Sequence, residues 1–205
     1  MPVTGTLITS AIVANMTPRS IKGRDAASLA SAIGTAVATH VTTPNMVSCT
    51  VSGSAGPLGS ITSVAVAGIV SKTMSGMMLL KAQSKSLIGR DIITLFDAVS
   101  AGIAQVMIGS ILTGSSVGCA VGAGTGKYVA LNEKALAGLI VLNATAKSLK
   151  GRNMVDLADC VSFGVVNHLK SSATYSVLVA GAIAPTPPTG PVAVVGIPSV
   201  TTKVS

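Results

Sequence analysis

The hydrophobic and polar positions of the chain alternate between two kinds of segment, and the alternation occurs three times. Apolar residues at helical spacing come first in each copy, and short β-branched runs separated by Gly and Pro follow. The spacing predicts a first helix in each copy over residues 7–16, 69–82 and 133–146. It predicts a second helix over residues 25–41, 91–108 and 153–169.

One stretch between the two helices is written three times, at residues 19–25, 85–91 and 147–153. Its glycines are Gly23, Gly89 and Gly151, which lie where a helix can end in a left-handed residue at low cost. Two residues further on, Asp25, Asp91 and Asn153 can cap the next helix with a side-chain oxygen. Each copy is therefore expected to fold as a tight helical hairpin.

The fold class that follows is α+β, with three tandem divergent repeats, each a helical hairpin followed by a β-hairpin. The modules are expected at residues 1–68, 69–132 and 133–197, with a polar, extended C-terminal tail at 198–205. The paired strands are expected at 46–51 with 61–66, 117–121 with 128–131, and 175–179 with 192–197. Their unpaired edges offer a route to pairing between copies or subunits.

Composition favours assembly over an isolated monomer. Charged residues make up only 10% of the chain, and aromatic residues make up 2%. With so few charged groups, little on the surface would keep an isolated monomer soluble in water. Small residues at Ala36, Gly102 and Gly164 allow a neighbouring element to approach the second helix closely. We therefore expect a homo-oligomer whose apolar helix faces are covered by other subunits.

The formal net charge of +8 comes from Lys and Arg that cluster only around the three repeated stretches. Such an excess suits an acidic partner or nucleic acid. With two Phe, two Tyr and no Trp, stacking on bases is not expected, so any contact with nucleic acid is non-specific. The tight turn between helices is also compatible with a helix-turn-helix protein, but residues 91–95 carry almost no base-reading side chains, which argues against it and leaves duplex contact as an open alternative.

The invariant arginines Arg24, Arg90 and Arg152 admit two readings. Each is either a solvated turn residue or holds a carboxylate or carbonyl on the next module or subunit, where a lysine would not fit the same geometry. His40 and His168 lie seventeen residues past their glycines, near the ends of equivalent helices, and are expected to cap or pack there.

No metal or cofactor is expected. Cys49, Cys119 and Cys160 have no C-x-x-C spacing and are interpreted as core residues, with an intersubunit disulfide left open.

Two enzyme-like motifs fail on context, so the sequence predicts no catalytic residues. Residues 114–118 match G-x-S-x-G around Ser116, with Asp156 or Asp159 and then His168 in the usual chain order. A nucleophile elbow needs a strand before the serine and a helix after it, which is the reverse of the expected order here. Residues 122–127 fail two positions of a phosphate-binding loop and are interpreted as a hairpin loop.

A membrane-embedded or membrane-active protein is the alternative interpretation. Residues 98–126 carry no charge and are long enough to span a bilayer. Seven glycines interrupt them, however, and the repeat predicts a change from helix to strand midway. The start of the chain lacks the basic region of a signal peptide.

Two segments carry a resemblance to a known class of protein. Residues 32–41 and 161–169 are Ala- or Val-rich amphipathic helices that end near a His and an apolar residue and lead into Gly/Pro-punctuated β segments. In this they resemble virion structural proteins of tailed bacteriophages. The resemblance implies a non-enzymatic building block of capsid, neck, tail or baseplate, located in the virion and bound to other virion proteins.

Overall fold

The structure is a computed structural model. It describes residues 3–23, 25–42, 48–55, 60–67, 69–87, 89–108, 111–117, 121–128, 130–172, 175–180, 192–198 and 201–204. Side chains are described in residues 3–23, 25–42, 69–87, 89–108 and 130–172.

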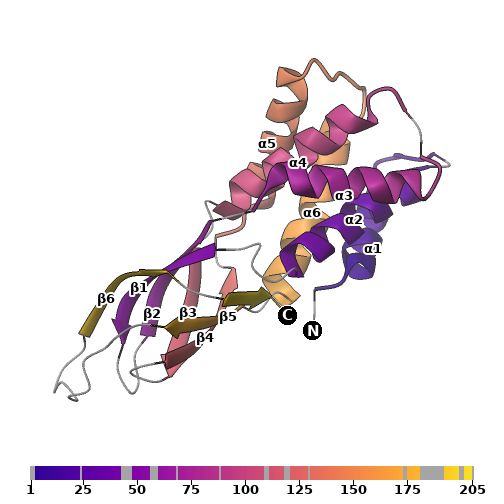
Figure 1. Ribbon diagram of the computed structural model, residues 1–205. Helices are drawn as coiled ribbons and strands as arrows, with labels where there is room; N and C mark the ends of the chain where they lie inside the picture. The colour runs from indigo at the N-terminus through magenta and orange to yellow at the C-terminus, as the bar shows by residue number, and fades with distance from the viewer. Residues whose placement is uncertain are drawn as a thin grey trace.

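Six helices form the body of the molecule (Figure 1), which we call the helical body. They are α1 (Gly5–Met16), α2 (Ala26–Thr42), α3 (Ser71–Gln83), α4 (Ile92–Ile108), α5 (Glu133–Ala146) and α6 (Met154–Ser172). Each predicted helix is confirmed, with its ends shifted by at most three residues. The 3.6-residue period of apolar residues was sufficient to locate these helices, because each helix has one continuous buried stripe.

The helices pack in a closed ring. Each helix contacts the helix before it and the helix after it along the chain, and α6 returns to pack against α1. The three helical hairpins therefore have equivalent neighbours, as in a threefold arrangement.

Equivalent positions of the three copies build the core. The first helices bury three residues four positions apart: Ile8, Ile12 and Met16 in α1, Met74, Met78 and Ala82 in α3, and Leu136, Ile140 and Ala144 in α5. The second helices bury the matching pairs Ile33 and Val37, Val99 and Ile103, and Val161 and Val165. Each fully buried large aliphatic side chain contributes about 1.5–3 kcal/mol. The helical body is therefore closed by its own apolar stripes.

The strands are described by their backbone alone. They are β1 (Ser48–Ala55), β2 (Ser60–Ala67), β3 (Ile111–Val117), β4 (Val121–Tyr128), β5 (Tyr175–Ala180), β6 (Val192–Pro198) and β7 (Thr201–Val204). Their order is β6-β1-β2-β3-β4-β5-β7, and all described pairings are antiparallel. Figure 1 shows these strands extending from one end of the helical body.

The prediction of an α+β fold with a β-hairpin in each module is wrong. Where side chains are described, the regular structure is all-helical, with six helices and no strand or β-hairpin. The six apolar stripes cover one another, so the core of this body needs no sheet. The backbone pairing also differs, because β5 pairs with β4 and β7 while β6 pairs with β1.

The middle copy departs most from its predicted strands. The described backbone places strands at Ile111–Val117 and Val121–Tyr128, so the expected glycine loop at 122–127 lies inside a strand. Gly124 and Gly126 pair with residues of β3 on one side and of β5 on the other, so they belong to an extended strand. The high glycine content had instead suggested a loop. In the tail, Thr201–Val204 pairs with β5. The module boundaries at 68, 132 and 197 stay a prediction.

Candidate functional site

The three turns between paired helices share one backbone geometry. Ser20, Ser86 and Ser148 have φ of 55°, 54° and 58°, in the left-handed region. The next residue donates its N–H five residues back: Ile21 to Met16 O at 3.1 Å, and Leu87 and Leu149 to Ala82 O and Ala144 O at 2.9 Å. A left-handed residue followed by this bond is the Schellman end of a helix.

The prediction that Gly23, Gly89 and Gly151 are the left-handed residues is therefore wrong. The chain reverses three residues earlier, because the apolar residue after each serine must turn back towards the end of its own helix. The predicted start of each second helix is confirmed, since the carbonyls of Asp25, Asp91 and Asn153 accept the first helical bonds, each at 2.9 Å.

Small residues form the junctions between copies, as the sequence predicts. A Cβ added to Gly164 of α6 would lie 2.6 Å from Ile12 Cγ1 of α1, and one added to Gly102 of α4 would lie 2.9 Å from Ile140 Cγ1 of α5. Ile12 and Ile140 occupy equivalent positions of their copies. The third junction, between α2 and α3, has buried Ala36 and Met78 at the matching positions.

Ion pairs cross two of the three junctions at equivalent positions. Arg19 Nη2 lies 3.5 Å from Asp159 Oδ2, and Lys147 Nζ lies 3.8 Å from Asp97 Oδ2. Each basic residue opens a repeated stretch, and each acid lies eight residues past the glycine of the adjacent copy. The third pair would join Lys85 to Ser31, which has no charge.

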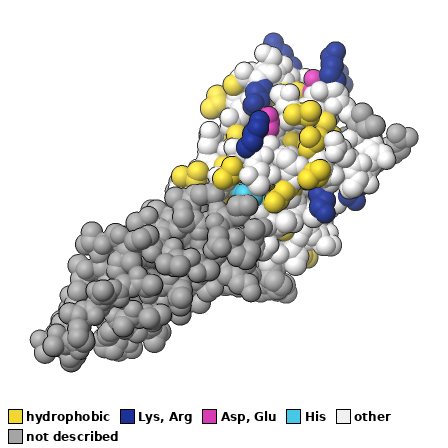
Figure 2. Space-filling view, in the orientation of Figure 1, with side chains coloured by type: hydrophobic (Ala, Val, Ile, Leu, Met, Phe, Trp, Pro, Cys, Tyr) yellow, Lys and Arg dark blue, Asp and Glu magenta, His cyan; other side chains and the backbone are white. Residues whose placement is uncertain are grey.

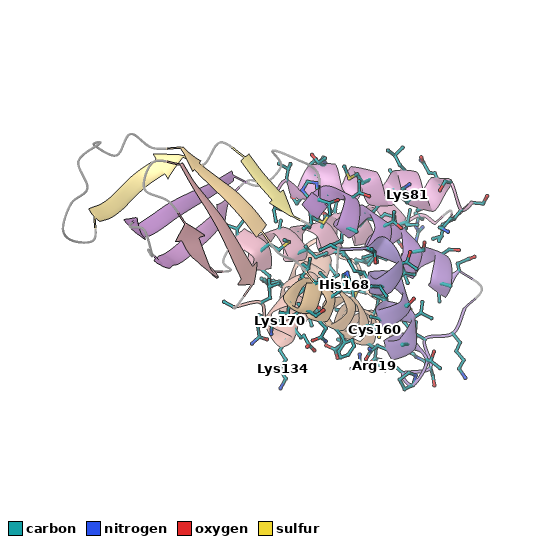
Figure 3. The ribbon with its side chains drawn as sticks, turned by 90° about the horizontal axis from the view of Figure 1, so that it is seen from below. Arg19, Lys81, Lys134, Cys160, His168 and Lys170 are labelled. Atoms are coloured by element: carbon teal, nitrogen blue, oxygen red, sulfur yellow. The ribbon has the colours of Figure 1, made fainter. Side chains whose placement is uncertain are left out.

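These pairs were missed by sequence reasoning, although a signal existed. The first position of the repeated stretch is basic in all three copies, and Asp97 and Asp159 recur at one position. Arg19 Nη1 also donates to Cys160 Sγ at 3.4 Å, as Figure 3 lets the reader follow. This hydrogen bond is the main cause of a raised pKa of Arg19, which keeps its charge fixed.

The invariant arginines make no such junction where the structure describes them. The Arg90 side chain is 95% exposed, and its Nε lies 3.9 Å from the carboxylate of adjacent Asp91. Arg152 is also exposed, while Arg24 lies outside the described residues. Arg90 therefore contacts the adjacent Asp91 and not another module of the same chain, as one of the two interpretations had expected. Contact with another subunit stays a prediction.

The two histidines are buried, as the packing interpretation expects. The Nε2 atom of His168 accepts a hydrogen bond from the Thr4 N–H at 3.1 Å, which joins the end of α6 to the start of α1. His40 is fully buried, and neither of its ring nitrogens has a hydrogen-bond partner in the described part of the chain. Burial lowers the pKa of both side chains. Their predicted role as caps of terminal carbonyls is not what the described contacts show.

Cys160 is a buried core residue in α6, as predicted, and a thiol so placed is not available at the surface. The side chains of Cys49 and Cys119 lie outside the described residues.

The serine and the lysine of the two enzyme-like patterns lie on strands, whereas the acidic residues and the histidine lie on a helix. Ser116 is in β3 and Lys127 is in β4, and their side chains are not described. Asp156, Asp159 and His168 all belong to α6. Within the described residues no group of three or more His, Cys, Asp or Glu side chains could hold a metal ion.

Two equivalent apolar patches lie on the outside of the helical body. The α3–α4 patch is Gly76, Leu79, Leu80 and Ile93, and Leu80 and Ile93 are 67% and 55% exposed. Gly76, Leu79 and Ile93 line a hollow of about 210 Å³. The α5–α6 patch is Gly138, Val141, Leu142 and Val155, with Leu142 and Val155 64% and 60% exposed. Figure 2 shows hydrophobic side chains reaching the surface among Lys and Arg.

The first copy lacks this patch. Its matching residues are Ser10, Val13, Ala14 and Ala27. The Leu and β-branched residues of the other two patches were visible in the sequence, but a helix period alone does not say which apolar residues remain exposed.

Among the described helices, none combines the length and the hydropathy needed to cross a bilayer. Comparison with protein-family models, with curated proteins and with solved structures finds no match.

Proposed function

We propose that the chain is a non-enzymatic structural subunit that assembles with further copies of itself and with neighbouring proteins, as a component of a tailed-phage virion. The α3–α4 and α5–α6 patches carry this proposal, because they expose large apolar side chains at repeated positions. The virion setting is supported by the resemblance of residues 32–41 and 161–169.

Each patch has the features of a docking face. A Cβ added to Gly76 or Gly138 would have no atom within 4 Å, so another backbone can approach the helix there. Fully burying a leucine contributes about 1.5–3 kcal/mol, whereas association costs about 4–15 kcal/mol. One patch is thus too small alone. Two patches on one chain can each engage a neighbour, and contacts then add up across an assembly.

The first copy has small residues at the patch positions, which supports two docking faces on the subunit and not three. Ala14 stands where the other copies have Leu80 and Leu142, and Ala27 stands where they have Ile93 and Val155. A ring with three full patches would present the same face on every side. Because one of the three faces lacks the large apolar residues, the subunit has a defined orientation relative to its neighbours.

The proposal is tested by the size of the purified chain. We expect mass photometry and sedimentation velocity to show oligomers that grow with protein concentration. Leu142→Glu, and more strongly Leu80→Glu with Leu142→Glu, should shift the population to monomer, because a carboxylate would be taken out of water at the interface.

The repeat supplies the matched control. Ala14→Glu places the same charge at the same position of the first copy, and it should leave the oligomer unchanged. A wild-type chain that stays monomeric at high concentration contradicts the proposal. So does an oligomer that all three variants weaken equally.

A further inference from the structure

The positive charge of the chain is concentrated in the three repeated stretches. Residues 19–25, 85–91 and 147–153 hold eight of the fourteen Lys and Arg residues and two of the six acidic residues. Arg19 and Lys147 are used in ion pairs within the helical body. Lys22, Lys85, Arg90, Lys150 and Arg152 are exposed, and we call these five residues the basic end.

The packing brings the basic end together. All three turns lie at the end of the helical body opposite the strands, because each hairpin enters and leaves at the other end (Figure 1). The Arg19–Asp159 pair holds the α1–α2 turn beside α6, and the Lys147–Asp97 pair holds the α5–α6 turn beside α4. Figure 2 shows Lys and Arg side chains projecting from the top of the helical body, away from the large grey region at lower left.

We propose that the basic end binds the phosphate backbone of double-stranded nucleic acid without reading its sequence. Exposed Lys and Arg on several turns of one helical body can each neutralise a phosphate. The three stretches contain no aromatic residue, so they offer no platform for the bases of a single strand. This function goes beyond assembly and does not depend on it.

A duplex fits the basic end better than an acidic protein does. Protein interfaces place an apolar, well-packed centre inside a polar rim. The apolar residues of these turns that the structure describes, Ile21, Leu87 and Leu149, are half-buried against their own helices. The exposed apolar patches lie on the outer faces of the helices instead. Where the structure describes them, the turns therefore present charge without an exposed apolar centre, and such a surface suits a phosphate backbone.

The proposal is tested by fluorescence anisotropy with a labelled random-sequence DNA duplex, titrated at several KCl concentrations. We expect micromolar binding at low salt that weakens steeply as KCl rises. Lys150→Ala with Arg152→Ala should reduce affinity at about 50 mM salt at least about tenfold and lower the salt slope by about two. Arg152→Lys should retain binding, because a phosphate contact needs charge rather than a bidentate fork.

The matched control removes the same charge elsewhere. Lys134 and Lys170 are exposed at the end of the α5–α6 hairpin nearer the strands (Figure 3). Lys134→Ala with Lys170→Ala should leave both affinity and slope close to wild type. Equal losses in the two double variants would show an effect of net charge alone and overturn the proposal.

Two further outcomes would also overturn it. One is stronger binding to single-stranded DNA than to the duplex. The other is displacement of the duplex by polyglutamate at matched charge, which would assign the surface to acidic proteins. Repeating the titration with Leu142→Glu separates this proposal from assembly, because the basic end is complete in one subunit.

Discussion

At the scale of single residues, the turns show why a glycine motif misleads. Gly23, Gly89 and Gly151 are the most regular feature of the repeat, and glycine is the usual left-handed residue at a helix end. The structure assigns that conformation to Ser20, Ser86 and Ser148. The apolar residue that follows each serine was the better signal, because it packs back on its own helix. A left-handed residue with a side chain costs about 1–2 kcal/mol.

This assignment predicts opposite effects for two neighbouring substitutions. Ser148→Gly should raise the free energy of unfolding by about 1 kcal/mol, because it removes the left-handed strain. Gly151→Ala should be neutral or stabilising by up to about 1 kcal/mol, since an added Cβ meets no atom within 4 Å and the backbone there is not left-handed. Urea denaturation of the two variants measures both. A cost for Gly151→Ala with no gain for Ser148→Gly would return the left-handed role to the glycine.

The buried His40 predicts a pH-dependent stability. Burial lowers its pKa in the folded chain, so below the ordinary value of 6.5 the unfolded chain binds more protons. Stability should therefore fall as the pH is lowered from 7 to 5. The middle copy has Val106 at this position. His40→Val should flatten the dependence measured by urea denaturation, leaving the part due to His168. An unchanged slope would show that His40 does not titrate across this range.

At the scale of helices, the sequence predicted each helix and its face of close approach, but not which helices meet at each junction. Six periodic segments gave six helices, and Ala36, Gly102 and Gly164 marked the faces of close approach. The strands failed because Gly-rich runs such as 121–128 have no apolar alternation that fixes their ends. The junction ion pairs depend on which copy lies next to which. That order is a property of packing, which no single segment encodes.

The missing third ion pair predicts a stabilising substitution. Ser31→Asp places a carboxylate where Asp97 and Asp159 stand in the other copies, opposite Lys85. The two existing pairs are partly exposed, so the gain should be small, about 0.2–1 kcal/mol, and should shrink in high salt. Urea denaturation of Ser31→Asp with and without Lys85→Met measures the coupling. An equal gain in both backgrounds would rule out a pair with Lys85.

At the scale of the whole molecule, the sequence showed a threefold repeat but not its closure. Tandem helical hairpins can stack as an open array, in which each repeat meets only its neighbours along the chain. Here α6 packs against α1, and Gly164, Ile12 and the Thr4–His168 hydrogen bond form that closing junction. A closed ring has no terminal repeat. Loosening the α6–α1 junction therefore leaves both the first and the last hairpin without one of their two neighbours.

Ring closure predicts that damage at the closing junction spreads to the opposite side. Gly164→Ala should cost about 1–3 kcal/mol, because the added Cβ would lie 2.6 Å from Ile12 Cγ1 and 3.1 Å from the Ile8 carbonyl oxygen. Gly138→Ala is the matched control, since it is also helical but meets no atom within 4 Å, and should stabilise by up to about 1 kcal/mol.

Native-state hydrogen exchange then follows amides in α3 and α4, which do not touch the substituted site. In a closed ring their protection falls together with that of α1 and α6, because the six helices open as one unit. Protection lost only in α1 and α6 would show instead that the hairpins open independently.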